Sequence, residues 1–227
     1  MFKSFNYLLL LITASLALAT GVNAGENETN KLKSITFGES NTLYSLRQLD
    51  KKLIIDAVGQ KSASGLFIES PEACLKADSL SWSWRVDRIQ PTADITVEER
   101  EDFAAAIMIL FGKPGLFSKP KGLIYAFTNT DLPANSVVDS PRAPDNFRTI
   151  VLDNQDSPLK NWLSWERNII DDYQLAYGEL PDKDLHTIGV FTDNDQTLEP
   201  VAASYDLRSC NLSLRAAIDG LELESDD

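Results

Sequence analysis

Two tryptophans stand two positions apart in a stretch where polar and apolar residues alternate. In residues 80–87, Leu80, Trp82, Trp84 and Val86 share one face of a predicted β-strand. A pair of indole rings at this spacing could stack on a sugar ring or another flat ligand. Burial in the core is the alternative, because Leu80 and Val86 lie on the same face.

The opposite face of this strand carries Ser81, Ser83, Arg85 and Asp87. The two small serines leave room for a polar ligand that Arg85 would bind. A solvated surface explains the same residues without any ligand. Arg85 is therefore a candidate binding residue.

Glu166 is the most unusual carboxylate, because it falls within the apolar side of a helix predicted over residues 158–177. It could form a buried ion pair with Arg85 or Arg148, or it could bind a ligand. It could also act as a catalytic acid, with Asp102 as the second carboxylate that glycan hydrolysis requires.

Oxygen-bearing side chains alternate in residues 193–199, beginning with Asp193 and Asp195. This spacing suits a loop that wraps a calcium ion, although Leu198 stands where an EF-hand has glycine. A strand-end turn rich in Asp and Asn is the alternative. We expect no other cofactor, because a zinc site or a catalytic triad would depend on His186, the only histidine.

The only two cysteines, Cys74 and Cys210, lie 136 positions apart. In an oxidising compartment they would form a disulfide that contributes about 4 kcal/mol by closing a long loop. Two separately buried thiols are the alternative.

The N-terminus has the features of a secretory signal peptide. Lys3 precedes an apolar stretch at residues 7–18, and small residues end at Ala24, after which we expect cleavage. The protein should then be periplasmic or secreted, with no membrane span remaining. Residues 25–34 should form a flexible polar arm, 35–220 a single domain, and 221–227 an acidic tail.

Composition excludes one class of partner. Of 227 residues, 34 are acidic and 21 are Lys or Arg, which gives a formal net charge of −13. Such a surface repels phosphate backbones, so we expect no nucleic-acid partner. We expect a monomer.

Many short strands and one long helix are expected in the domain. The predicted strands are 42–48, 52–58, 63–69, 80–87, 103–111, 122–128, 147–153, 185–192 and 200–207. Strands that follow one another without alternating helices indicate a mainly β protein built as an antiparallel sandwich.

The helix over residues 158–177 is predicted from its end signals. Ser157 would be the N-cap, and Gly178 would end the helix. On its polar side, Arg167 and Asp171 have the spacing of an ordinary surface ion pair.

Several segments resemble the bacterial exported family known as domain of unknown function 3047. The resemblance rests on residues 62–66, 80–86, 101–105, 165–169, 171–173, 188–195 and 203–206. The order of elements is also similar, more weakly, to galactose-binding-like jelly-roll modules that bind carbohydrate. These resemblances imply export and a single jelly-roll domain, and they assign no reaction.

The leading hypothesis is a non-catalytic envelope protein that binds a ligand, with a glycan as the candidate, through Trp82, Trp84, Arg85 and Glu166. A glycan hydrolase using Glu166 and Asp102 is the second hypothesis. The third is a structural protein or one that binds a protein partner.

Overall fold

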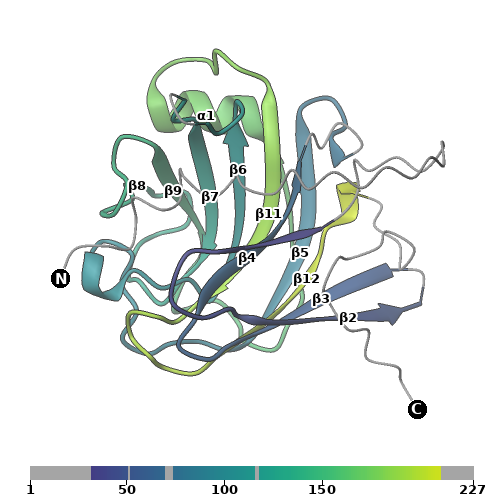
Figure 1. Ribbon diagram of the computed structural model, residues 1–227, viewed down its shortest axis with the longest axis vertical. Helices are drawn as coiled ribbons and strands as arrows, with labels where there is room; N and C mark the ends of the chain where they lie inside the picture. Colours follow the sequence, from purple (N-terminus) through teal and green to yellow (C-terminus); the bar gives the residue numbers. More distant parts are fainter. Residues whose placement is uncertain (1–31, 51, 70–73, 116–117, 211–227) are drawn as a thin grey trace, which may run out of the picture.

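Two β-sheets packed face to face form the body of the protein (Figure 1). The computed structural model describes residues 32–50, 52–69, 74–115 and 118–210. The predicted signal peptide, the acidic tail and most of the polar arm lie outside these residues. Strand β1 begins at Lys33, so the arm does not extend to residue 34 as predicted.

The larger sheet has seven strands. Their order is β1 (Lys33–Thr36), β4 (Ala63–Glu69), β11 (Leu185–Asp193), β6 (Ala105–Phe111), β7 (Lys121–Phe127), β9 (Phe147–Asp153) and β8 (Val137–Asp139). All pairs are antiparallel except β7 with β9, which is parallel. The segment between these two strands, which includes β8, makes the crossover.

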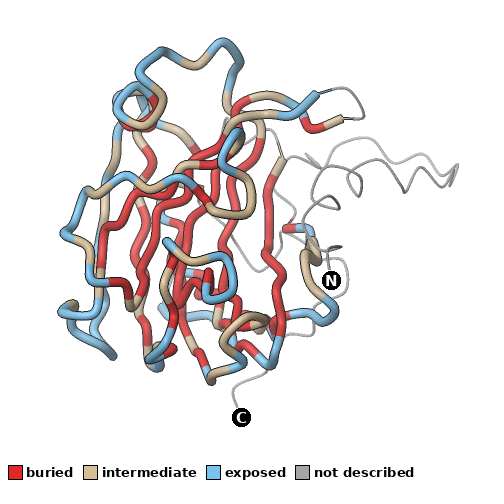
Figure 2. Tube along the Cα trace, turned by 90° about the vertical axis from the view of Figure 1, so that its left-hand side faces the viewer, coloured by how far each residue is buried: buried red, intermediate tan, exposed pale blue. Residues whose placement is uncertain are grey.

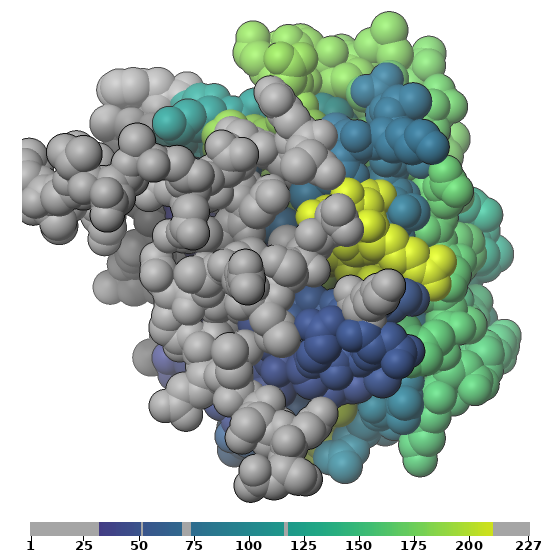
Figure 3. All heavy atoms as spheres, turned by 90° about the vertical axis from the view of Figure 1, so that its right-hand side faces the viewer, coloured from purple at the N-terminus to yellow at the C-terminus, as the bar shows by residue number. Residues whose placement is uncertain are grey.

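The smaller sheet has five antiparallel strands. Their order is β10 (Leu163–Asn168), β5 (Ser79–Arg88), β12 (Val201–Asp206), β3 (Lys52–Gly59) and β2 (Leu43–Leu49). In Figure 3 the dark-blue β2–β3 hairpin lies beside the yellow C-terminal part of the described chain, as the pairing of β12 with β3 requires. The mainly β prediction is confirmed, and every predicted strand is present within about two residues.

The predicted long helix is wrong in its first half. Residues 163–168 form β10, which pairs with β5, and the helix α1 covers only Ile169–Tyr177. Asn168 is the N-cap, because its side chain accepts hydrogen bonds from the amides of Ile170 and Asp171. Ser157 instead donates to Asp153. The helix ends at Gly178, as predicted, with a left-handed φ of 73°.

The main core fills the space between the sheets. Along β6, Ile107 and Ile109 point into this core, whereas Ala106 and Met108 point to the outer face of the larger sheet. Those outward residues belong to a second apolar cluster. Figure 2 shows that the strands are buried along most of their length, while exposed segments gather at their ends.

The second cluster means that the larger sheet is apolar on both faces. Its outer face carries Phe67, Met108, Ile124 and Phe191. The ring of Phe67 lies against the backbone of Gly65, where an added Cβ would come within 2.5 Å of the ring. Glycine is therefore required for this close approach. These residues are buried, because side chains that include Phe37, Leu132 and Val138 pack against them.

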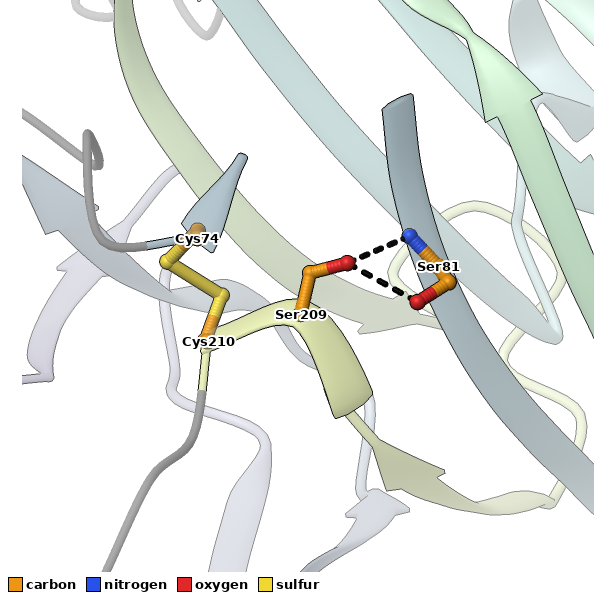
Figure 4. The surroundings of a disulfide bond; sticks show 4 residues. All are labelled: Cys74, Ser81, Ser209 and Cys210. Atoms are coloured by element: carbon orange, nitrogen blue, oxygen red, sulfur yellow. Dashed lines mark hydrogen bonds between the residues drawn. A yellow bond between two sulfur atoms is a disulfide. The ribbon is translucent and has the colours of Figure 1, made fainter. Parts of the chain in front are cut away.

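The last described turn is joined to the start of β5. The predicted disulfide between Cys74 and Cys210 is present. Beside it, the backbone amide of Ser81 donates to Ser209 Oγ at 2.7 Å (Figure 4). The disulfide indicates an oxidising environment. Among the described residues, no helix is long and apolar enough to cross a membrane.

Candidate functional site

Trp82 and Trp84 do not form a surface platform. Both side chains are fully buried between the sheets, where Trp82 packs on Tyr125 with ring centroids 5.1 Å apart. Trp84 Nε1 donates to Asp153 Oδ2 at 2.7 Å. The predicted role in stacking on a ligand is therefore corrected to a role in the core, since Leu80 and Val86 share their face and are also buried.

Arg85 lies on the opposite face of β5, as the alternation predicts. It is half-buried, and its guanidinium pairs with Asp87 at 2.7 Å. Arg85 and Trp84 therefore cannot contribute to one binding site.

Glu166 is exposed, because it lies on the outward face of a strand and not inside a helix. Its Oε1 accepts a hydrogen bond from Ser79 Oγ at 3.0 Å. The predicted arginine partners are engaged elsewhere, Arg85 with Asp87 and Arg148 with Asp139. The buried ion pair predicted for Glu166 is therefore wrong.

Glu166 and Asp102 also fail as a catalytic pair. Glu166 lies opposite Ser81, beyond the last residues of β12, whereas Asp102 binds Thr197 in the loop before β12. The length of that strand, on the order of 20 Å, separates the two carboxylates. Two-carboxylate hydrolysis requires less than about 10 Å.

Asp102 instead joins the two aspartates predicted to bind calcium. Carboxylate oxygens of Asp102, Asp193 and Asp195 lie within 4.8 Å of one another. Asp102 closes the 196–197 turn, because its Oδ2 accepts from the amide of Thr197 at 2.7 Å. The amide of Phe103 donates to Asp193 at 2.6 Å. Calcium binding by Asp193 and Asp195 stays a prediction.

Burial and mutual repulsion govern these aspartates. The pKa of Asp193 is raised well above its usual range, first by burial and then by the charges of Asp102 and Asp195. Burial and Asp102 also raise the pKa of Asp195, although Arg142 opposes them. A positive charge placed here would relieve this repulsion.

Glu101 is a fourth carboxylate close to this cluster, and it faces a loop from a distant part of the sequence. Its side chain is 4% exposed, and its Oε1 accepts from Ser140 Oγ at 2.7 Å. Arg142 Nε lies 3.4 Å from its Oε2. Burial raises the pKa of Glu101 to about 7, although Ser140 and Arg142 act in the opposite direction.

These groups meet at a pocket on the outer face of the larger sheet. Its hollow measures about 550 Å³ including the space at its open mouth. The lining residues are Phe37, Ala63, Glu101, Phe103, Met108, Ile124, Ser140, Arg142, Phe147, Phe191, Asp193 and Asp195.

Phenylalanine rings form much of the wall. The ring centroids of Phe37 and Phe191 are 5.4 Å apart, and those of Phe103 and Phe191 are 6.1 Å apart. A second pocket of about 410 Å³, including space open to solvent, shares Phe37 and Met108, so the apolar surface continues toward His186. The arrangement places an apolar wall next to carboxylates, as binding sites for small molecules do.

Most of this site escapes prediction from the sequence. Asp193 and Asp195 were identified as candidate ligands, and Asp102 was considered only as a partner of Glu166. Glu101 gave one usable signal, an acidic residue directly before a central strand. No sequence signal identified Arg142 or Ser140, because they lie in a loop whose position in the fold cannot be predicted from the sequence pattern.

The fold and the site define a class of protein: a two-sheet β protein with an acidic, phenylalanine-lined pocket on the outer face of its larger sheet. The chain belongs to the family described as "Protein of unknown function (DUF3047)", which matches residues 30–207. Among curated proteins, none matches.

One similar solved structure is the xyloglucanase domain of NopAA, a type three effector from Sinorhizobium fredii, in complex with cellobiose. It is 10% identical with a TM-score of 0.42, and the match covers 77% of this chain and 90% of that domain.

Proposed function

We propose that this protein is an exported, non-catalytic ligand-binding protein, and that its ligand binds at the outer-face pocket. One observation carries the proposal: the larger sheet is apolar on both faces, and only one face is covered by the second sheet. Segments at its rim leave a hollow in which apolar and charged groups converge. A glycan of the cell envelope is the candidate ligand, because stacking on phenylalanine rings suits sugars.

Export is part of the proposal. It is supported by the leader-like sequence that ends at Ala24 and by the disulfide, which persists only in oxidising compartments.

The first test is thermal melting of the purified protein against a panel of soluble envelope glycans. A ligand that binds only the folded state raises the melting temperature in a saturable way. The Phe37→Ala variant should lose this shift, because Phe37 is only half-buried and lines both pockets. The Leu175→Ala variant is the matched control, because Leu175 is 59% exposed on α1 and lines neither pocket.

Loss of the shift in Phe37→Ala alone would support the pocket as the binding site. A shift that persists in Phe37→Ala would place the ligand elsewhere. If no glycan or small molecule shifts the wild-type protein, the structural or partner-binding hypothesis would replace this one.

A second function is favoured by the pKa of Glu101. A carboxyl with a pKa of about 7 is protonated in about half of the molecules at neutral pH and can act as a general acid in glycan hydrolysis, with Asp195 as the second carboxylate of the same pocket. Hydrolysis of an envelope glycan that disappears in Glu101→Gln, while the fold is retained, would establish it. Absence of hydrolysis across the panel leaves the binding function in place.

A further inference from the structure

The pocket contains more acidic than basic side chains. Glu101, Asp193 and Asp195 line it, and Arg142 is the only cation among the lining residues that the structure describes. Asp102 lies directly behind them, with its carboxylate within 4.8 Å of two of the three. Arg142 can balance one charge, and it also donates to the backbone carbonyl of Glu98 at 2.9 Å. With all carboxylates ionised, the site keeps a surplus of negative charge.

One buried oxygen of the site lacks a hydrogen bond. Glu101 Oε2 is buried and accepts no hydrogen bond within the described residues, and Arg142 Nε lies 3.4 Å from it. A buried carboxylate oxygen is normally hydrogen-bonded. Because Glu101 lines the pocket, a cationic group of a ligand can reach the hollow beside it.

The other walls determine which kind of cation fits. Calcium requires six to eight oxygen ligands, whereas Phe37, Phe103 and Phe191 cover one side of the hollow with aromatic carbon. Aromatic rings attract organic cations through the electrostatic potential of their faces. The hollow, about 550 Å³ with its open mouth, leaves room for an alkylammonium group beside the rings, with the remainder of the ligand at the mouth.

We propose that the ligand presents an alkylammonium group to Glu101 and Asp195, with the phenylalanine rings around its methyl or methylene carbons. This inference rests on the proposed function and specifies the chemistry of the ligand. It predicts an amine-bearing ligand, such as an amino sugar with a free amine, in preference to a neutral glycan.

The test compares choline with 3,3-dimethylbutan-1-ol, which has the same shape without the charge. Both are titrated into the purified protein at pH about 8, where Glu101 is ionised, and binding is followed by calorimetry and by chemical shifts. Choline should bind at least about 10-fold more tightly. Equal affinity would overturn the role of charge and would still support an apolar binding pocket.

Two variants locate the charge that matters. Glu101→Gln should weaken choline binding about 10-fold and leave binding of the neutral alcohol unchanged. Glu99→Gln is the matched control, because Glu99 is exposed and does not line the pocket. If Glu101→Gln does not fold, Asp195→Asn at the half-buried side of the site should give the same selective loss. Full choline affinity in these variants would overturn the proposal.

Two further outcomes separate this inference from the proposed function. If a neutral glycan raises the melting temperature through Phe37 while choline does not bind, the ammonium proposal fails and the binding function stands. If calcium raises the melting temperature and chelation lowers it in a way that depends on Asp193, the surplus charge serves a metal and the ammonium proposal is overturned.

Discussion

The two faces of the seven-stranded sheet both bury carboxylates, but they provide them with very different partners. On the inner face, Asp172 accepts two hydrogen bonds from Arg167 and one from the hydroxyl of Tyr125 at 2.8 Å. Asp153 accepts from the indoles of Trp84 and Trp165 at 2.7 and 2.9 Å. Each inner carboxylate therefore has a full set of donors.

On the outer face, three carboxylates, those of Glu101, Asp193 and Asp195, line one pocket in which Arg142 is the only cationic lining residue that the structure describes. Arg142 interacts with Glu101 and Asp195, and Glu101 Oε2 accepts no hydrogen bond within the described residues. A buried carboxylate that is fully hydrogen-bonded has a structural role, since removing one of its partners leaves a buried charge that destabilises the fold. A surplus of carboxylates beside an open hollow instead favours a partner from outside the chain. The predictions below test this difference.

The largest effect is expected on the inner face. Trp84→Ala should lower the free energy of unfolding by about 3–5 kcal/mol, because it removes a fully buried ring and one donor to Asp153. Denaturant unfolding measures this loss. Unchanged stability would contradict the placement of Trp84 in the core.

Loss of the arginine that serves Asp172 should cost somewhat less. Arg167→Met should destabilise the fold by about 3 kcal/mol, since the carboxylate of Asp172, 7% exposed, would lose both hydrogen bonds from the guanidinium and keep the one from the hydroxyl of Tyr125. Combining it with Asp172→Asn should restore part of the loss. If the double variant is no more stable than Arg167→Met, the ion pair is not the cause.

On the outer face, Glu101 should make stability depend on pH. Its pKa is about 7 in the folded protein against 4.5 in the unfolded chain, so the folded state holds the proton more tightly. The resulting stabilisation is fully present below pH about 4.5 and is lost as pH rises to about 7, a change of about 3 kcal/mol.

The measurement is the difference in unfolding free energy between wild type and Glu101→Gln across this range. Arg142, Glu98 and Asp193 interact electrostatically with Glu101 and remain in both proteins, so the difference isolates Glu101. A difference that does not vary with pH would contradict the raised pKa.

The smallest effect is expected for Ser140→Ala. Removing the hydroxyl that donates to Glu101 Oε1 should cost about 1 kcal/mol and move the pKa of Glu101 further upward. A carbon-detected NMR titration of the glutamate carboxyls reads the pKa directly. Ser136→Ala is a control, because Ser136 lies at the other end of β8 and does not line the pocket. A downward shift in Ser140→Ala would show that the hydrogen bond does not stabilise the ionised form.

The strands were predictable because their alternation is local. Residues 63–69 and 147–153 have the predicted bounds, and the disulfide was one of two outcomes expected for the two cysteines. The helix was predicted too long because residues 163–168 satisfy both periodicities. Pairing with β5, a long-range contact, decides in favour of a strand.

The site was largely beyond sequence reasoning, because its walls come from segments far apart in the chain. Phe37, Phe103, Ser140 and Phe191 come together only when β1, β11 and the loops beside β6 and β8 assemble. The tryptophans drew attention as potential ligand-stacking residues, yet alternation alone cannot distinguish an inner from an outer face. Glu166 was expected to be buried only because its segment was predicted to be helical.

Titration of Glu101 with and without choline tests the central claim most directly. In the free protein its carboxyl should titrate near pH 7. If an ammonium group binds beside it, choline should lower that midpoint, since a nearby positive charge favours the ionised form. A midpoint near the ordinary value of glutamate, or one that saturating choline leaves unchanged, would contradict the account.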